Sequence, residues 1–285
     1  MNGIIIVNKP VGYTSRDVVN ELCRIFNTKK VGHCGTLDPG ASGVLVICIG
    51  KSLKVCELLT NHDKEYIAGI TLGIETDTLD MDGKIINDEA VNISNDDIIN
   101  AVNSFIGKYN QEVPKYSAVK VNGRKLYEYA RDNIDIALPK RSVEIYNISI
   151  IDNIVHENGK ISFKIKCSVS KGTYIRSLVR DIGNKLSVPA VMSSLVRTKQ
   201  GIFDIANSYT LDDIKNNDYK IISITDALDI PIIKVDDDIA FKIKNGVILD
   251  KFFDTNMAFI TDKEGTLLAL YKLDNDKNRP YKMFI

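Results

Sequence analysis

The sequence contains no tryptophan, and its five cysteines form no C-x-x-C pair. Its three histidines stand at no metal-ligand spacing, which argues against a structural zinc site. No apolar run approaches about 18 residues and no basic-then-apolar leader opens the chain. We therefore expect no membrane span, and a cytoplasmic protein with reduced thiols. Lysine and arginine number 37, as do aspartate and glutamate, so net charge gives no sign of nucleic acid.

Charge is nevertheless distributed unevenly along the chain. Acidic residues outnumber basic ones by seven between residues 75 and 97, whereas the segment from 171 to 201 has a surplus of five positive charges. Either segment can be an ordinary solvated surface, and a basic segment can also contact phosphates. The basic segment contains one acid, Asp181, and six basic residues: Lys171, Arg176, Arg180, Lys185, Arg197 and Lys199.

Strand and helix patterns are mixed without regular alternation. Thr14 or Ser15 can cap a helix whose apolar residues recur at helical spacing, and Ser94 can cap another. Val44–Ile49 is apolar throughout and is typical of a buried strand. Asn158-Gly159 between alternating apolar runs predicts a hairpin. These patterns favour an α+β fold with a mixed, mainly antiparallel sheet and flanking helices.

The length of 285 residues suits one large domain followed by a small one. Pro231 is the expected boundary, which gives a first domain of residues 1–230 and a second of residues 231–285. The second segment shows short strand patterns around the turn at Gly265. At about 55 residues it is close to the lower limit for independent folding, so we expect it to pack against the larger domain.

Two other stretches resemble ligand-binding motifs only in part. Gly50 and Lys51 suggest a phosphate-binding loop, but that pattern requires a glycine where Leu45 stands. The acidic turn from Thr78 to Gly83 nearly fits a calcium loop, but Thr78 occupies the first ligand position and no helix pair surrounds it.

The stretch from His33 to Gly43 places an ionisable pair, His33 and Asp38, on a glycine-rich loop ahead of a buried strand. Glycine allows close backbone approach to a ligand, and Pro39 biases Asp38 to an extended conformation. A carboxylate held in this way suits a nucleophile or a base, although a structural aspartate in a turn is equally compatible with the spacing.

A second stretch runs from Ser170 to Leu178. Thr173 is expected to cap the following helix, with Tyr174 and Arg176 in its first turn and Lys171 just outside. An aromatic ring, a guanidinium and an ammonium together suit a base and its phosphates. Arg176 can equally hold a buried carboxylate, and a plain surface helix start is the third interpretation.

Together these stretches resemble the TruB-type tRNA pseudouridine synthases, in an ordered set of motifs from Asn2 to about Phe203. The motifs are Val7-Asn8-Lys9-Pro10 with Gly12 and Thr14-Ser15, His33 to Gly43, Lys64-Glu65-Tyr66, Leu72-Gly73 with Thr76-Asp77-Thr78 and Asp80, Pro114, Tyr116-Ser117-Ala118, Gly123, Leu126-Tyr127-Glu128, Ala130-Arg131, Ser170 to Arg176, Asp181-Ile182-Gly183, Leu195, Arg197-Thr198, and Gly201 with Phe203.

The resemblance implies a role for each matching residue. Asp38 matches the catalytic aspartate, Tyr66 the tyrosine that stacks on the target base, and Arg176 the arginine that pairs with the catalytic carboxylate. The remaining matches are Tyr174 beside that arginine, His33 near the flipped nucleotide, and Lys9 and Leu195 lining the pocket. Lys171, Arg180, Arg197 and Lys199 are the expected phosphate contacts.

The resemblance further implies a pseudouridine-synthase fold, with a small β-rich tail similar to an RNA-binding PUA domain. The implied substrate is the T-arm stem-loop of tRNA, at the uridine conventionally numbered 55. No metal, cofactor, membrane or protein partner is implied, and we expect a monomer. Three alternatives stay open: a non-catalytic tRNA-binding or folding protein, the same chemistry on another RNA, and a carboxylate-dependent enzyme acting on a small nucleoside or sugar.

Overall fold

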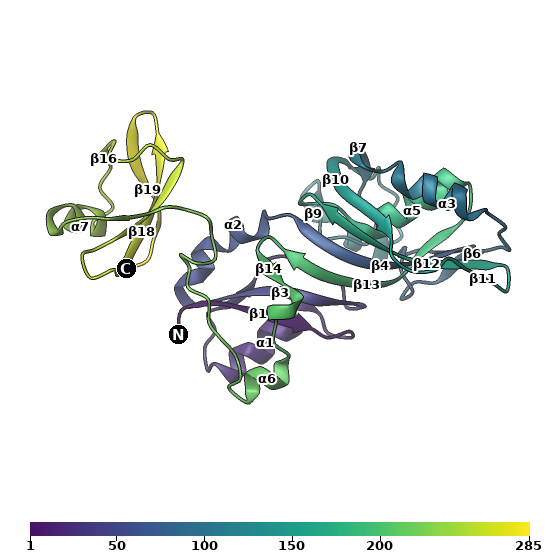
Figure 1. Ribbon diagram of the computed structural model, residues 1–285, viewed down its shortest axis with the longest axis horizontal. Helices are drawn as coiled ribbons and strands as arrows, with labels where there is room; N and C mark the ends of the chain where they lie inside the picture. The colour runs from purple at the N-terminus through teal and green to yellow at the C-terminus, as the bar shows by residue number, and fades with distance from the viewer.

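A ten-stranded sheet forms the body of the protein in a computed structural model that describes residues 1–285 (Figure 1). All strand pairs in this sheet are antiparallel except β3 with β13, which confirms the expected mainly antiparallel α+β fold. Seven strands form its main path, in the order β1 (Gly3–Lys9), β3 (Ala41–Ile49), β13 (Ala190–Gln200), β4 (Lys64–Leu72), β12 (Lys160–Val169), β10 (Lys140–Ile150) and β7 (Gly107–Glu112). Three short strands pair with members of this path: β2 (Val31–His33) with β3, β11 (Val155–Glu157) with β12, and β14 (Phe203–Asp204) with β13.

The late strand β13 lies between two early strands, β3 and β4. Its parallel pairing with β3 places Leu195 opposite Ala41 and Arg197 opposite Gly43. Its antiparallel pairing with β4 places Arg197 opposite Tyr66. The sheet therefore brings the end of the Asp38 loop, the centre of β13 and the start of β4 together.

Helices cover the sheet in two groups. In Figure 1, α1 and α6 lie below the β1 end of the sheet, whereas α3 and α5 lie at the opposite end. Thr14 caps α1 through the backbone N–H of Asp17, and Ser94 caps α3, as the sequence predicted. The helices are α1 (Ser15–Ile25), α2 (Cys56–Thr60), α3 (Asn95–Asn103), α4 (Leu126–Arg131), α5 (Ile175–Leu186), α6 (Leu211–Lys215) and α7 (Asp237–Lys244), with 3-10 turns η1 (Gly50–Val55) and η2 (Ile205–Asn207). None of these helices has both the length and the apolar character needed to cross a bilayer.

The start of α5 differs from the prediction. Thr173 does not occupy the N-cap position, and its hydroxyl donates to the carbonyl of Ser170 at 2.9 Å. Tyr174 occupies the N-cap position and makes no side-chain capping bond. Gln111 on β7 instead accepts from the Tyr174 N–H at 2.8 Å and donates to its carbonyl at 3.1 Å. A side chain from a distant strand therefore fixes this helix start, which local sequence cannot reveal.

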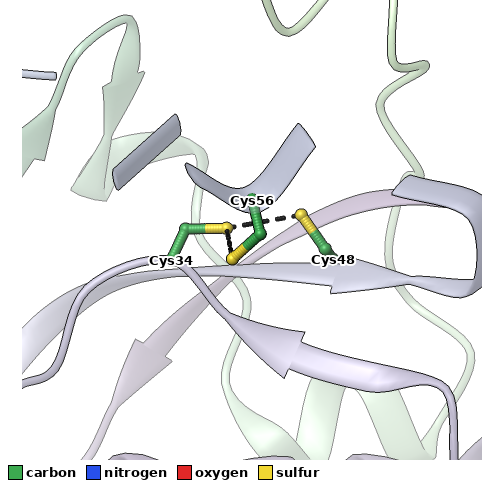
Figure 2. A group of neighbouring side chains, drawn as sticks. All are labelled: Cys34, Cys48 and Cys56. Carbon is green, nitrogen blue, oxygen red and sulfur yellow. Dashed lines mark hydrogen bonds between the residues drawn. The ribbon is translucent and has the colours of Figure 1, made fainter. Parts of the chain in front are cut away.

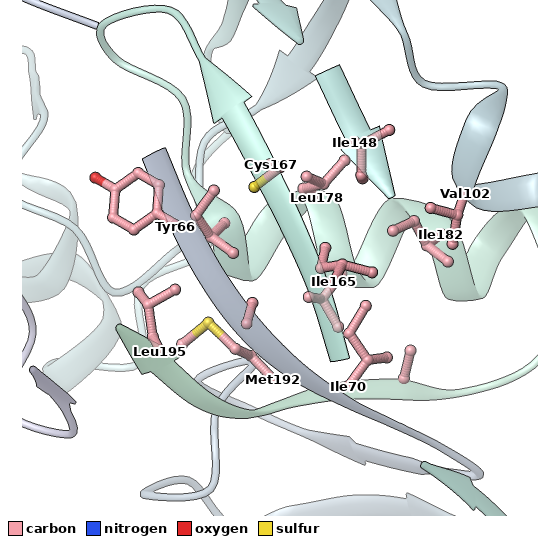
Figure 3. Close-up of a cluster of buried hydrophobic side chains, with 14 of the residues drawn as sticks. Tyr66, Ile70, Val102, Ile148, Ile165, Cys167, Leu178, Ile182, Met192 and Leu195 are labelled. Atoms are coloured by element: carbon pink, nitrogen blue, oxygen red, sulfur yellow. The ribbon is translucent and has the colours of Figure 1, made fainter. Parts of the chain in front are cut away.

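The largest core cluster packs α3 and α5 against β4, β12, β10 and β13. Figure 3 shows Tyr66 and Leu195 on neighbouring strands at one end of this cluster, with Val102 and Ile182 at the other. Tyr66 and Leu195 are each 8% exposed. The rigid packing of this core therefore extends directly to the two side chains that the resemblance assigns to the pocket wall.

Short hairpins project from the sheet. Asn158 and Gly159 both adopt positive φ between β11 and β12, which confirms the predicted hairpin. Asn122 and Gly123 form the same kind of turn in a second, smaller hairpin. The separate two-stranded sheets are β5 (Ile74–Thr76) with β6 (Ile85–Asp88), and β8 (Lys120–Val121) with β9 (Arg124–Lys125).

A curled β domain forms the C-terminal part of the chain, at the left of Figure 1. Its Phe259, Leu270 and Phe284 belong to the same buried cluster as residues of β1 and β3. Lys282 also pairs with Glu57 of α2 at 2.8 Å. The domain therefore packs on the larger sheet, as expected for so short a segment. Its strands are β15 (Ile232–Lys234), β16 (Leu249–Asp250), β17 (Met257–Thr261), β18 (Leu267–Asp274) and β19 (Lys277–Met283).

Gly43 offers a test of the β3–β13 contact. A Cβ atom on Gly43, whose φ is +102°, would lie 2.3 Å from the carbonyl oxygen of Arg197. Gly107 has a φ of +106° but no atom within 4 Å of its added Cβ. We expect Gly107→Ala to lower the free energy of unfolding by about 1–2 kcal/mol from backbone strain alone. Gly43→Ala should lower it by at least ~3 kcal/mol, since the clash adds to that strain.

Urea denaturation of both variants beside the parent protein measures this difference. Equal losses of stability in the two variants would show that the close approach of β3 to β13 contributes nothing.

Candidate active site

A pocket of about 880 Å³ opens where β4 and β13 meet residues 35–38 and 169–176. It contains most of the residues that the resemblance singled out. The expected site residues that line it are Asp38, Tyr66, Lys171, Tyr174, Arg176, Leu195 and Arg197.

An ion pair between Asp38 and Arg176 lies in this pocket. A carboxylate oxygen of Asp38 is 3.0 Å from an Nη of Arg176. The Arg176 side chain is 7% exposed, whereas that of Asp38 is 41% exposed. The pairing that the resemblance implied is therefore present, and it leaves the carboxylate open to a molecule in the pocket while the guanidinium is enclosed.

Arg176 also holds two other chain segments. It donates to the carbonyls of Thr78 at 3.0 Å and Tyr116 at 3.1 Å. Asp80 lies 3.6 Å from the same guanidinium and is the second carboxylate of this group. A buried cation is stable only when its donors are paired, and these four partners from three segments satisfy that requirement. The acidic turn around Asp80 thus serves as a counter-charge to Arg176.

The loop that carries Asp38 is fixed from both sides. The Ser15 hydroxyl accepts from the Leu37 N–H at 2.9 Å and donates to the Leu37 carbonyl at 3.1 Å. The carbonyl of Pro39 accepts from the Gly12 N–H at 2.9 Å. Asp38 is therefore held between two anchored neighbours, as a carboxylate with a positional role requires.

Lys9 does not line the pocket, contrary to the expectation. Its side chain is fully buried, and its ammonium donates to the carbonyls of Pro10, Tyr13 and Pro39. Burial lowers the pKa of Lys9 to about 8, and the nearby Asp38 carboxylate opposes that shift. Lys9 therefore supports the loop from behind. The three carbonyls that accept from its ammonium hold the side chain in this buried position, and the sequence alone does not show that they lie together.

Arg197 is also buried, at 1% exposure. Its guanidinium donates to the carbonyls of Val44 at 2.7 Å, Gly35 at 3.1 Å and Thr36 at 3.4 Å. The prediction of a surface phosphate contact is therefore wrong for Arg197, because its donors are already used inside the protein. It holds the Asp38 loop against β3 instead.

The other predicted phosphate contacts differ in position. Arg180 lies outside the pocket and pairs with Glu112 at 3.2 Å and Asp181 at 2.9 Å. Lys199 is exposed, lies outside the pocket and pairs with Asp204 at 3.3 Å. Lys171 alone among the four has an exposed side chain that lines the pocket.

His33 does not line the pocket either. It ends β2, is half-buried, and its Nδ1 is buried without a hydrogen-bond partner. Burial lowers the pKa of this imidazole. The structure therefore gives no contact between His33 and the pocket that Asp38 faces.

Lys64 and Arg141 line the pocket, although sequence analysis gave neither of them a site role. Lys64 is two residues before Tyr66 on β4, so strand alternation points both side chains to one face. Its ammonium donates to the carbonyls of Thr60 and His62, and burial lowers its pKa to about 8. The alternation of side chains along β4 could therefore have predicted Lys64 as a pocket residue, whereas no pattern in the neighbouring sequence predicts Arg141.

The chain matches models of a known protein family over most of its length. Residues 23–175 match the N-terminal domain of the TruB family of pseudouridylate synthases, and residues 176–230 match the tRNA pseudouridylate synthase B C-terminal domain. The chain belongs to the TruB family of pseudouridylate synthases. It is therefore an isomerase that forms pseudouridine from uridine.

Relatives in this family cover nearly the whole chain. The tRNA pseudouridine synthase B of Bacillus subtilis is 40% identical over 95% of this chain and 93% of its own. That of Caldanaerobacter subterraneus is 38% identical over 100% of this chain and 99% of its own. The family assignment thus extends through the C-terminal β domain.

Two solved structures share the fold over 99% of this chain and 85% of theirs, each with a TM-score of 0.70. One is from an H/ACA ribonucleoprotein bound to a substrate RNA containing 2′-deoxyuridine, at 25% identity. The other is from a Cbf5–Nop10–Gar1 complex, at 26% identity. Both likenesses extend over the large sheet and the C-terminal β domain of this chain.

The lowered pKa of Lys9 predicts a pH-dependent stability. In the unfolded chain Lys9 has its ordinary pKa of 10.5, and in the folded protein a pKa of about 8. Between these values the unfolded state binds more protons, so stability rises with pH. The free energy of unfolding of the wild type, measured relative to that of Lys9→Met, should rise by up to ~1.4 kcal/mol for each pH unit from pH 8 to 10.

Urea denaturation of wild type and Lys9→Met at pH 7, 8, 9 and 10 measures that difference. A constant difference across the series would contradict the burial of a titrating ammonium.

Proposed function

We propose that this protein isomerises a uridine of tRNA to pseudouridine in the T-arm loop, at the position conventionally numbered 55, with Asp38 as the essential carboxylate. The observation that carries the proposal is the exposed carboxylate of Asp38, 3.0 Å from an enclosed Arg176 in the pocket of about 880 Å³. The relatives named tRNA pseudouridine synthase B support tRNA as the substrate.

The reaction breaks the bond between the sugar C1′ and N1 of uracil, turns the base, and joins C1′ to C5. Substrate and product have the same formula, so the reaction consumes no oxidant, reductant or nucleotide. Breaking the glycosidic bond develops oxocarbenium character on the sugar, which a nearby carboxylate stabilises. Three roles are open to Asp38: bonding to C1′, attacking the base, or taking the proton from C2′.

The target uridine must leave its stack to reach Asp38, which costs a few kcal/mol. Stacking on Tyr66 would offset roughly 1–3 kcal/mol of that cost. Tyr66 and Leu195 sit on rigid strands and form an apolar wall of the pocket. Such a wall suits a reaction whose detached uracil must be kept from water until it has turned.

Phosphates of the RNA are proposed to approach the pocket mouth at Lys171, which is exposed there, with Arg141 lining the same pocket. We propose a monomer as the working unit. We further propose that residues 231–285 act as a small RNA-binding domain similar to PUA modules, next to the catalytic domain of residues 1–230.

The role of Asp38 is tested with an unmodified T-arm stem-loop RNA, in which pseudouridine is mapped by chemical derivatisation and primer extension. Wild type should convert the loop uridine, and Asp38→Asn should be slower by at least ~10⁴-fold, because an amide supplies neither the nucleophile nor the base. The variant should retain RNA binding, since Asp38 is anionic and makes no favourable phosphate contact.

Each other outcome has a definite meaning. Tight binding without conversion by wild type would favour an RNA-binding protein or a different RNA target. Equal conversion by both proteins would leave the reaction standing and overturn the assignment of Asp38. Conversion of free uridine would favour a small-molecule enzyme.

The phosphate contact is tested by salt dependence. Lys171→Met should reduce the slope of the logarithm of the T-arm association constant against the logarithm of salt concentration by about 1. Lys199→Met is the matched control, because Lys199 lies outside the pocket and is paired with Asp204. An equal change of slope in both variants would mean that the pocket mouth is not where the phosphates bind.

A further inference from the structure

Three cysteines from separate segments meet in the interior. Cys34 follows β2, Cys48 lies on β3, and Cys56 begins α2. The Cys34 sulfur is 3.3 Å from that of Cys48 and 2.8 Å from that of Cys56, and all three sulfurs lie within 4.8 Å of one another. Figure 2 shows the three side chains pointing toward one point, with Cys34 between the other two.

The surroundings of this cluster are apolar. Cys34 and Cys48 are 0% exposed and belong to a buried cluster with Val46, Val55 and Leu59. A thiol is a weak hydrogen-bond donor and a weak acceptor, so hydrogen bonding gives little reason to gather three of them. Three converging sulfurs in a dry site are instead the ligand arrangement that a soft or borderline cation selects.

We propose that Cys34, Cys48 and Cys56 bind one Zn²⁺ ion, with His33 as the fourth ligand. Zn–S bonds of about 2.3 Å in a tetrahedral site put the sulfurs about 3.8 Å apart. The Cys34 sulfur lies closer than that to both partners, at 3.3 Å from Cys48 and 2.8 Å from Cys56, so the site requires Cys34 to move outward by about 1 Å.

His33 borders the cluster and has a free ring nitrogen, but that ring lies outside the group of ligand atoms within 4.8 Å and must turn toward the sulfurs to supply the fourth bond. It precedes Cys34 directly in the chain, and its Nδ1 is buried with no hydrogen-bond partner. Its carbonyl accepts from the Cys56 thiol at 3.2 Å, so the residue borders the cluster. Three cysteines with one histidine is an established donor set for structural zinc.

The proposed ion would brace the loop that carries Asp38. Cys34 stands four residues before Asp38, and its carbonyl accepts from Gln200 at 2.6 Å. A closed site at this position would tie β2, β3 and α2 together beneath the loop, which is a structural role and not a catalytic one. The spacings of 14 and 8 residues between the cysteines match no local zinc motif, so only the fold reveals the cluster.

Cobalt substitution tests the site in the full-length protein, reduced and freed of metal with a chelator under anaerobic conditions. Titration with Co²⁺ should give one equivalent of binding, a thiolate-to-cobalt charge-transfer band and the intense visible bands of a tetrahedral ion. Zn²⁺ should then displace the cobalt and remove these bands. Cys34→Ala, Cys48→Ala and Cys56→Ala should each lower the affinity by more than ~100-fold.

Cys23→Ala and Cys167→Ala are the matched controls, because these free cysteines lie outside the cluster. Both should bind Co²⁺ like wild type. Thermal unfolding gives an independent readout: saturating Zn²⁺ should raise the Tm of wild type by roughly 5 °C or more and leave that of Cys56→Ala unchanged.

The proposal is overturned if no charge-transfer band appears, or if the Cys56→Ala variant binds Co²⁺ as tightly as the Cys23→Ala control. His33→Ala should bind more weakly and lose tetrahedral intensity, and unaltered spectra would remove His33 from the ligand set. These measurements need no RNA, so they stand apart from the test of the isomerase activity.

Discussion

The guanidinium of Arg176 is the interaction on which the rest of the site depends. It lies at the start of α5 and contacts the Asp38 loop, the acidic turn at Asp80, and the carbonyls of Thr78 and Tyr116. A buried arginine without partners would be costly, so each of these segments must be in place before the cation is stable. The same group therefore lines the pocket and positions the carboxylate.

The sheet topology supplies the frame for that ion pair. Because β13 lies between β3 and β4, Arg197 reaches the carbonyls behind the Asp38 loop while Leu195 faces the pocket. Gly43 permits the close approach of the two parallel strands. Lys9 and Arg197 are thus buried cations that hold backbone carbonyls, whereas Lys171 and Arg141 are exposed cations that line the pocket.

Local sequence patterns predicted the features that depend on neighbouring residues. The caps at Thr14 and Ser94, the Asn158–Gly159 hairpin and the buried strand β3 all follow from short-range chemistry. The ion pair of Asp38 with Arg176 was accessible only through resemblance to a family, because 138 residues separate its members (176 − 38).

The errors share one physical cause. Arg197 and Thr173 were assigned from residue type and Lys9 from the family resemblance, whereas their positions are decided by carbonyls and side chains that only the folded chain brings near. From sequence alone a basic residue is easily interpreted as a phosphate contact, because the burial of its side chain and its hydrogen-bond partners are not yet known. The three-cysteine cluster was missed for the same reason, since its members converge from two strand ends and a helix start.

A single-turnover measurement on Arg176→Met tests this account most directly. With enzyme in excess over T-arm stem-loop RNA, the rate of pseudouridine formation should fall by at least ~10²-fold, because the carboxylate loses its positioning partner. RNA affinity, measured in parallel, should stay within about threefold, since the buried guanidinium makes no phosphate contact. An unchanged rate with a folded variant would contradict the central place given to Arg176.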